Sequence, residues 1–130
     1  MKLQVNELAH NATPADFLVL TATFRYLVEC KMVNLQSKQK NASRFDFARL
    51  TQELDLRHFD AYHTNNRGYV LLGFMERLSS RSDVYLVPIE DFCKIRDECP
   101  LKTITRFHAQ DMFSKYRIWV SGRFLRLNFE

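Results

Sequence analysis

Hydrophobic and polar positions divide the chain into short apolar runs and one longer segment with helix-like spacing. The runs are rich in Val, Leu, Phe and Tyr, and they cover residues 16–20, 24–33, 69–74 and 84–87. Their composition and length predict β-strands. Residues 21–23 separate the first two runs, which is a typical hairpin length. Residues 69–74 are apolar without interruption, so we expect that strand to be buried on both faces.

Helical spacing is clearest between residues 51 and 62, where apolar side chains recur at intervals close to one helical turn. These side chains are Leu54, Leu56, Phe59 and Tyr62. The polar and glycine-containing residues 65–68 then end the pattern. The segment therefore predicts a helix from about Thr51 to Tyr62.

Two further helices are predicted in the C-terminal half. Pro88 suits the first turn of a helix, where its missing N–H has no partner to lose. Glu90 and Asp91 follow it and complement the positive end of the helix. We expect this helix to end before Pro100, and a shorter helix to form at residues 107–113.

The chain ends in a predicted β-hairpin, in which the strands 116–120 and 123–129 flank the turn signal Ser121-Gly122. The resulting order is strand, strand, helix, strand, strand, helix and hairpin. This order predicts an α/β (α+β) fold, with a mixed central sheet flanked by helices. A chain of 130 residues has the size of a single domain, so we assign residues 1–130 to one unit.

The composition is that of an ordinary globular protein, with 46% hydrophobic and 26% charged residues. Its apolar runs are far too short to span a membrane, and the first residues lack the apolar stretch of a signal peptide. The three cysteines are odd in number and show no C-x-x-C spacing, which argues against a disulfide framework. We therefore expect no membrane partner and a reducing, cytoplasmic location.

Positive charge is concentrated near the C-terminus. The basic residues there are Lys94, Arg96, Lys102, Arg106, Lys115, Arg117, Arg123 and Arg126. Only Asp97, Glu98 and Asp111 oppose them in that segment. Such a segment suits a polyanionic partner such as nucleic acid, although a solvated surface explains the charge equally well.

Two carboxylates and an ammonium group stand out on the first two predicted strands. If these strands form a hairpin, Asp16 near the open end of the first comes close to Glu29 on the second. Glu29 and Lys31 are two residues apart on one strand and share a face. Their neighbours are largely apolar, so unpaired charges here would be costly.

Binding of a divalent cation would remove that cost. Mg²⁺ prefers oxygen ligands, which Asp16, Glu29 and a backbone carbonyl, that of Cys30, can supply. A bound cation lowers the pKa of a water molecule and polarises a phosphate ester, and Lys31 can offset charge in the transition state. The alternative is a buried salt bridge between Lys31 and either acid, with no catalytic role.

The residues Pro14-Ala15-Asp16 and Glu29-Cys30-Lys31 resemble the signature of the PD-(D/E)XK nuclease superfamily. The downstream residues 68–74, 83–92, 101–105 and 124–129 are similar to RecU-type Holliday-junction resolvases. The likeness covers the chain from about Thr13 onwards. It implies a restriction-endonuclease-like core and a Mg²⁺-dependent endodeoxyribonuclease of DNA recombination and repair, with Mn²⁺ as a substitute for Mg²⁺.

By this resemblance, Asp16 and Glu29 are expected to bind the metal and Lys31 to be the catalytic lysine. Gln52, on the following helix, is expected to contact a water molecule of the metal site or the DNA. Those resolvases carry a further acid on an N-terminal helix, for which Glu7 is the only candidate here, and its participation stays open.

The basic residues that follow the second strand are candidates for contact with the DNA backbone, because residues 38–43 form a predicted loop beside the metal site. These candidates are Lys38, Lys40, Arg44 and Arg49. Cutting two strands with one site per chain implies a homodimer with a twofold axis. The leading hypothesis is an endonuclease acting on branched DNA. The alternatives are a sequence-specific restriction or homing-type endonuclease and a non-catalytic nucleic-acid-binding relic.

Overall fold

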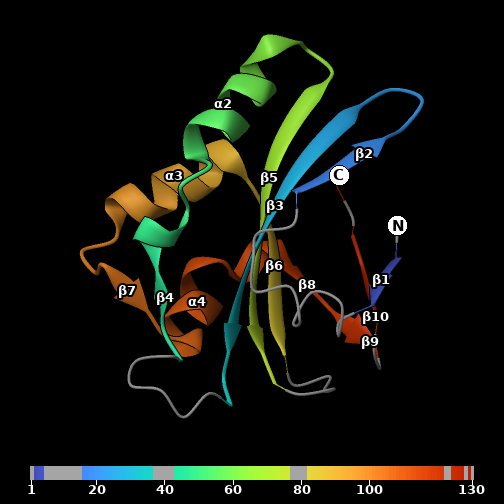
Figure 1. Ribbon diagram of the computed structural model, residues 1–130. Helices are drawn as coiled ribbons and strands as arrows, with labels where there is room; N and C mark the ends of the chain where they lie inside the picture. Colours follow the sequence, from blue (N-terminus) through green and yellow to red (C-terminus); the bar gives the residue numbers. More distant parts are fainter. Residues whose placement is uncertain are drawn as a thin grey trace.

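A mixed five-stranded β-sheet forms the centre of the computed structural model, which describes residues 2–4, 16–36, 43–76, 82–121, 124–127 and 129. The strand order is β2-β3-β5-β6-β8 (Figure 1). The strands are β2 (Asp16–Leu20), β3 (Arg25–Asn34), β5 (Asn66–Met75), β6 (Asp83–Pro88) and β8 (Arg117–Ile118). β3 and β5 are parallel, whereas the other neighbouring pairs are antiparallel. The predicted mixed sheet is confirmed.

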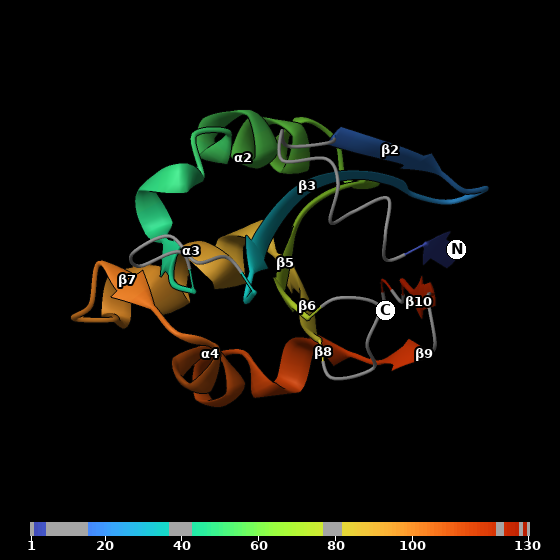
Figure 2. The ribbon, with the colours of Figure 1, turned by 60° about the horizontal axis from the view of Figure 1, so that its bottom comes forward.

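Within the described residues, three α-helices cover one face of this sheet (Figure 2). They are α2 (Glu53–Tyr62), α3 (Ile89–Glu98) and α4 (Arg106–Met112). α2 lies in the crossover that joins the parallel strands β3 and β5, as such a connection requires. All three helices were expected, and Pro88 caps α3 from the position just before it.

The packing of α2 on the sheet depends on one glycine. A Cβ atom at Gly68 would lie only 2.7 Å from the carbonyl oxygen of Leu56, so a larger residue would push the helix away from β5. Leu56 is the one buried residue of α2, whereas Leu54 and Tyr62 are 65% and 85% exposed. The predicted helix is present, but only part of its apolar spacing corresponds to buried positions. α2 packs chiefly on β5, and the outer strand β2 extends beyond it.

The opposite face of the sheet carries a second apolar core, which a small antiparallel sheet flanks. The strands of that sheet are β1 (Lys2–Gln4), β10 (Phe124–Arg126) and β9 (Val120–Ser121), in this spatial order. In Figure 2 they lie on the side of the central sheet away from the helices. β9 and β10 pair as the predicted C-terminal hairpin, but Ser121 is paired with Phe124 and so lies in a strand instead of the turn. β1 was not predicted.

The strand predicted at 116–120 is interrupted at Trp119. Arg117 and Ile118 stay in the five-stranded sheet as β8, and the next two residues join the three-stranded sheet as β9. One continuous strand was expected at 116–120, and two short ones replace it. A two-stranded sheet of β4 (Phe45–Asp46) and β7 (Thr103–Ile104) and the 3₁₀ helices Phe47–Arg49 and Ser114–Tyr116 complete the described elements.

A buried carboxylate holds the C-terminal half together. Asp83, at the start of β6, is 1% exposed. It accepts hydrogen bonds from Arg106 of α4 at 3.2 Å, Gln110 of α4 at 2.9 Å and Arg117 of β8 at 2.8 Å. A buried charge is tolerated when it is paired and hydrogen-bonded in this way. These contacts join α4 to two strands of the sheet.

Candidate functional site

Glu29 and Lys31 lie side by side on β3 and are both buried, with exposed fractions of 1% and 5%. They share the face of β3 that carries Leu27 and Val33, which is the face toward the helices. The Lys31 Nζ atom is 3.8 Å from Glu29 Oε1. That separation allows a charge interaction but is too long for a hydrogen bond.

The register of the first hairpin places Asp16 directly opposite Glu29. Directly opposed residues of an antiparallel pair have Cα atoms about 4.5–5.5 Å apart and share a face of the sheet. The Cα atoms of Asp16 and Glu29 are therefore neighbours across the two strands, as the predicted hairpin requires. The side chain of Asp16 lies outside the described part of the structure. β2 begins at this residue, and Asp16–Glu29 is the outermost pair of the hairpin among the described residues.

Glu29 Oε1 is fully buried, and among the described residues it accepts no hydrogen bond. Leaving a buried acceptor without a partner costs about 1–3 kcal/mol, and more when the group is charged. The salt bridge to Lys31 does not remove this cost, because its geometry leaves the oxygen without a donor. Buried orphan groups of this kind are rare in folded proteins and call for a missing partner, such as a water molecule or an ion.

Gln52 presents a second buried acceptor without a partner. It caps the start of α2, and its side-chain oxygen Oε1 accepts no hydrogen bond within the described ranges. The next residue, Glu53, is held by Arg96 of α3, and this hydrogen bond lowers the pKa of the Glu53 carboxyl. The anchored first turn of α2 therefore fixes the position of Gln52.

The oxygen ligands available near Glu29 suit a hard cation if a backbone carbonyl is included. Among the side chains that the structure describes, which do not include that of Asp16, no three His, Cys, Asp or Glu groups lie together. The Cys30 side chain packs in the core on the opposite face of the sheet, so only its carbonyl remains as a ligand next to Glu29. Carboxylate and carbonyl oxygens are the donors that Mg²⁺ and Mn²⁺ accept. The residues present therefore fit such an ion.

Two of the four basic residues predicted to contact nucleic acid can be placed. Arg44 is exposed, just before β4. Arg49 donates from Nη2 to the carbonyl oxygen of Met32 at 3.2 Å, so it lies beside β3 one residue beyond Lys31. Lys38 and Lys40 lie outside the described residues, as does Glu7.

Part of the basic C-terminal segment is engaged within the protein. Arg106 and Arg117 bind Asp83, and Arg96 binds Glu53 and Asp97. Three of the positive charges counted from the sequence thus hold elements together. The charge of this segment gives weaker support for a nucleic-acid surface than its composition suggested.

The Cys93 thiol is not suited to nucleophilic chemistry. Burial raises the pKa of the Cys93 thiol to about 11, so it is protonated at neutral pH. Cys30, Cys93 and Cys99 form no disulfide. No helix within the described ranges has the length and apolar character needed to cross a membrane.

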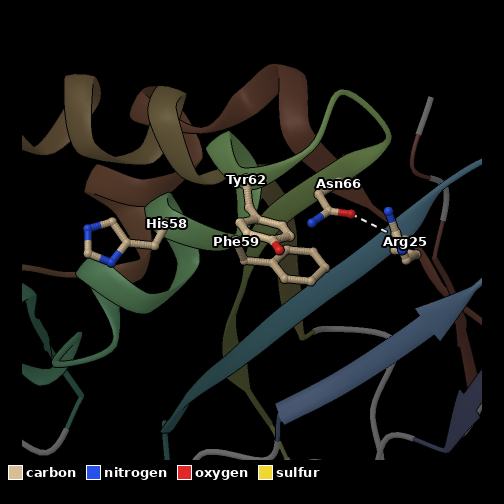
Figure 3. A pocket seen from close by; sticks show the side chains of 5 residues that line it. All are labelled: Arg25, His58, Phe59, Tyr62 and Asn66. Atoms are coloured by element: carbon tan, nitrogen blue, oxygen red, sulfur yellow. Dashed lines mark hydrogen bonds between the residues drawn. The ribbon is translucent and has the colours of Figure 1, made fainter.

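An open pocket of about 410 Å³ lies near the outer end of α2 (Figure 3). It is lined by Arg25, His58, Phe59, Tyr62 and Asn66. The sequence did not predict it, because Phe59 and Tyr62 indicate only helical spacing and Asn66 a break after the helix. Asn66 is in fact the first residue of β5, paired with Arg25 of β3. No local sequence pattern indicates the pocket, because the exposure of Tyr62 follows from the position of α2 on the sheet.

No protein-family model matches this chain, and no curated protein or solved structure is significantly similar to it.

Proposed function

We propose that this protein is a metal-dependent DNA endonuclease of the PD-(D/E)XK type, acting on branched DNA such as Holliday junctions. One observation carries the proposal. A buried glutamate with an orphan oxygen stands opposite a second acid in strand register, and a buried lysine lies two residues further along. A structural ion pair needs only one acid. This arrangement has two acidic positions, and the Lys31 Nζ atom lies 3.8 Å from Glu29 Oε1, beyond hydrogen-bond distance.

The residues divide into roles by their chemistry. Asp16, Glu29 and the Cys30 carbonyl would hold Mg²⁺ or Mn²⁺, which when bound neutralises phosphate charge and acidifies water. Lys31 places a positive charge beside Glu29 on the same face, where it can offset the charge that develops on a phosphate. Gln52 offers its buried oxygen to a water molecule or to the DNA.

Contact with DNA is supported by the position of the basic residues near β3. Arg49 is fixed to the strand next to Lys31, and Arg44 is exposed on the preceding turn. Lys38 and Lys40 belong to the segment between β3 and β4 and complete the proposed backbone contacts. A homodimer would supply the two sites that symmetric cutting of a junction needs. The absence of disulfides agrees with a proposed cytoplasmic location.

A substrate panel tests the proposed function. Purified protein with Mg²⁺ is incubated with end-labelled four-way junction, linear duplex, single-stranded DNA and RNA, and the products are resolved on denaturing gels. We expect cleavage of the junction near its branch point, with EDTA abolishing it. Cutting of linear duplex at one site would instead identify a sequence-specific endonuclease. Binding of DNA without any metal-dependent cleavage would contradict the nuclease and favour a non-catalytic relic.

A further inference from the structure

The pocket near the tip of α2 opens on the same face of the sheet as the proposed catalytic residues. Arg25 and Glu29 are both on β3, and their even spacing places them on one face. Four residues along a strand span roughly 13 Å, so the pocket lies a few nucleotides from the acids. α2 supplies the remaining wall through His58, Phe59 and Tyr62.

Two exposed leucines of β2, Leu18 and Leu20, form an apolar strip between the pocket and the Asp16–Glu29 pair. Leu20 of β2 stands opposite Arg25, and Leu18 stands opposite Leu27. These two β2 leucines are 67% and 58% exposed, because α2 packs on β5 and leaves β2 free. The next residue of the same face along β2 is Asp16, opposite Glu29. The pocket, the two exposed leucines and the Asp16–Glu29 pair therefore follow one another along the hairpin of β2 and β3.

A buried amide is directed into the pocket. Asn66 is 3% exposed, and its oxygen Oδ1 accepts a hydrogen bond from Arg25 Nε at 2.8 Å. Figure 3 shows the amide nitrogen turned the other way, toward the side of Phe59 and Tyr62. The oxygen is thus engaged with Arg25, and the residue lines the pocket. A side-chain amide at the wall of a pocket suits a ligand that carries acceptors.

The other walls define that ligand further. Tyr62 is 85% exposed and offers a ring face, with Phe59 beside it. Arg25 uses Nε for Asn66, which leaves the outer nitrogens of its guanidinium group for an anion. A flat aromatic group with hydrogen-bond acceptors, attached to a phosphate, meets all three requirements. Nucleobases stack on aromatic side chains in this way, and arginine pairs with phosphate.

We propose that this pocket binds one unpaired nucleotide of the DNA strand that is cut at the Asp16–Glu29 site. The inference rests on the proposed nuclease function and adds a substrate requirement to it. The base stacks on Tyr62 and accepts a hydrogen bond from Asn66, and its phosphate contacts Arg25. A base held in a duplex stack is not free to enter the pocket, so the enzyme selects strands in which a nucleotide near the cut is unpaired.

Binding measured without cleavage tests the pocket. Fluorescence anisotropy in EDTA compares a labelled oligothymidylate with a labelled blunt duplex. We expect Tyr62→Ala to weaken oligothymidylate binding by about 10-fold, which is a typical loss for one stacked base. Tyr62→Phe, which keeps the ring, should bind as the wild type does. The matched control is Phe107→Ala, since Phe107 is also exposed, at 71%, but lies on α4 outside the pocket. Blunt-duplex affinity should be the same for all four proteins.

A second readout follows the base itself. An oligonucleotide containing 2-aminopurine should lose emission on binding to the wild type and keep it with Tyr62→Ala, because stacking on the ring quenches the base. Wild-type affinity and quenching in Tyr62→Ala would overturn the inference, as would an equal loss of affinity for blunt duplex.

The binding and cleavage results together distinguish the pocket proposal from the nuclease proposal. If Tyr62→Ala binds normally while cleavage still requires Glu29, the pocket assignment falls and the nuclease stands. If the binding difference holds but no DNA is cut, base binding stands and the nuclease proposal falls.

Discussion

Lys31→Met should retain its fold in Mg²⁺ and lose cleavage by about 10²–10³-fold, the loss typical when one group that stabilises transition-state charge is removed. Lys31 is 5% exposed and 3.8 Å from the Glu29 carboxylate, so its removal leaves a buried negative charge. If the lysine served only to neutralise that charge, the variant would lose roughly 3–5 kcal/mol of stability whatever the metal content. If the acids hold a cation, added Mg²⁺ should restore most of the melting temperature.

Thermal melts of Lys31→Met in Mg²⁺ and in EDTA, run beside a cleavage assay, separate these cases. Lys94→Met is the matched control, because Lys94 is exposed on α3 and its loss should change neither melting nor cleavage. Equal destabilisation with and without Mg²⁺ would assign Lys31 to a structural salt bridge. Normal cleavage by the variant would remove it from the catalytic set.

Asp83→Asn should lower the free energy of unfolding by about 3 kcal/mol, because it leaves two partly buried arginines without their shared carboxylate. In the wild type, Gln110 and Arg117 donate hydrogen bonds to the Asp83 carboxylate oxygens. In the variant, the NH₂ group of the new amide takes the place of one of these oxygens and faces a donor. Urea or thermal unfolding measures the change. Asp97→Asn is the control, since Asp97 is 67% exposed in its pair with Arg96 and exposed pairs contribute at most about 1 kcal/mol. A melting temperature of Asp83→Asn within error of the wild type would contradict the assigned role of this cluster.

The main elements of the fold could be predicted because each depends on local sequence. β2, β3 and the turn between them follow from two apolar runs and a short polar gap, and α3 follows from Pro88 and the acids after it. β1 could not be predicted, because a three-residue strand has no periodicity and forms only by pairing with β10. The same is true of β4 and β7, two residues each, which pair across the chain.

The errors within predicted elements have a common cause, which is the position of an element relative to its neighbours. Tyr62 has the spacing of a core residue, but α2 lies over β5 and not over β2, so its tip is exposed. Asn66 looks like part of a turn, yet the parallel pairing with β3 extends the strand back to it. Arg106 and Arg117 look like surface charge, and the buried Asp83 that pairs with them is far away in sequence.

The candidate site was predictable only in part for the same reason. Alternation along one strand is enough to place Glu29 beside Lys31, and hairpin length brings Asp16 near them. The Arg25–Asn66 contact joins residues 41 positions apart, so no local pattern indicates the pocket. The orphan oxygen of Glu29 is likewise a property of three-dimensional packing and not of the motif.

The central claim is that Asp16 and Glu29 together carry metal-dependent cleavage, and single-turnover cleavage of a labelled four-way junction in saturating Mg²⁺ tests it most directly. The proteins compared are the wild type, Asp16→Asn, Glu29→Gln and the control Glu98→Gln, whose glutamate is exposed at the end of α3. We predict that Asp16→Asn and Glu29→Gln bind the junction and melt cooperatively but cut at least about 10²-fold more slowly, as expected when charge stabilisation at the phosphate is lost. Glu98→Gln should cut at the wild-type rate. Wild-type cleavage by either Asp16→Asn or Glu29→Gln would contradict the account.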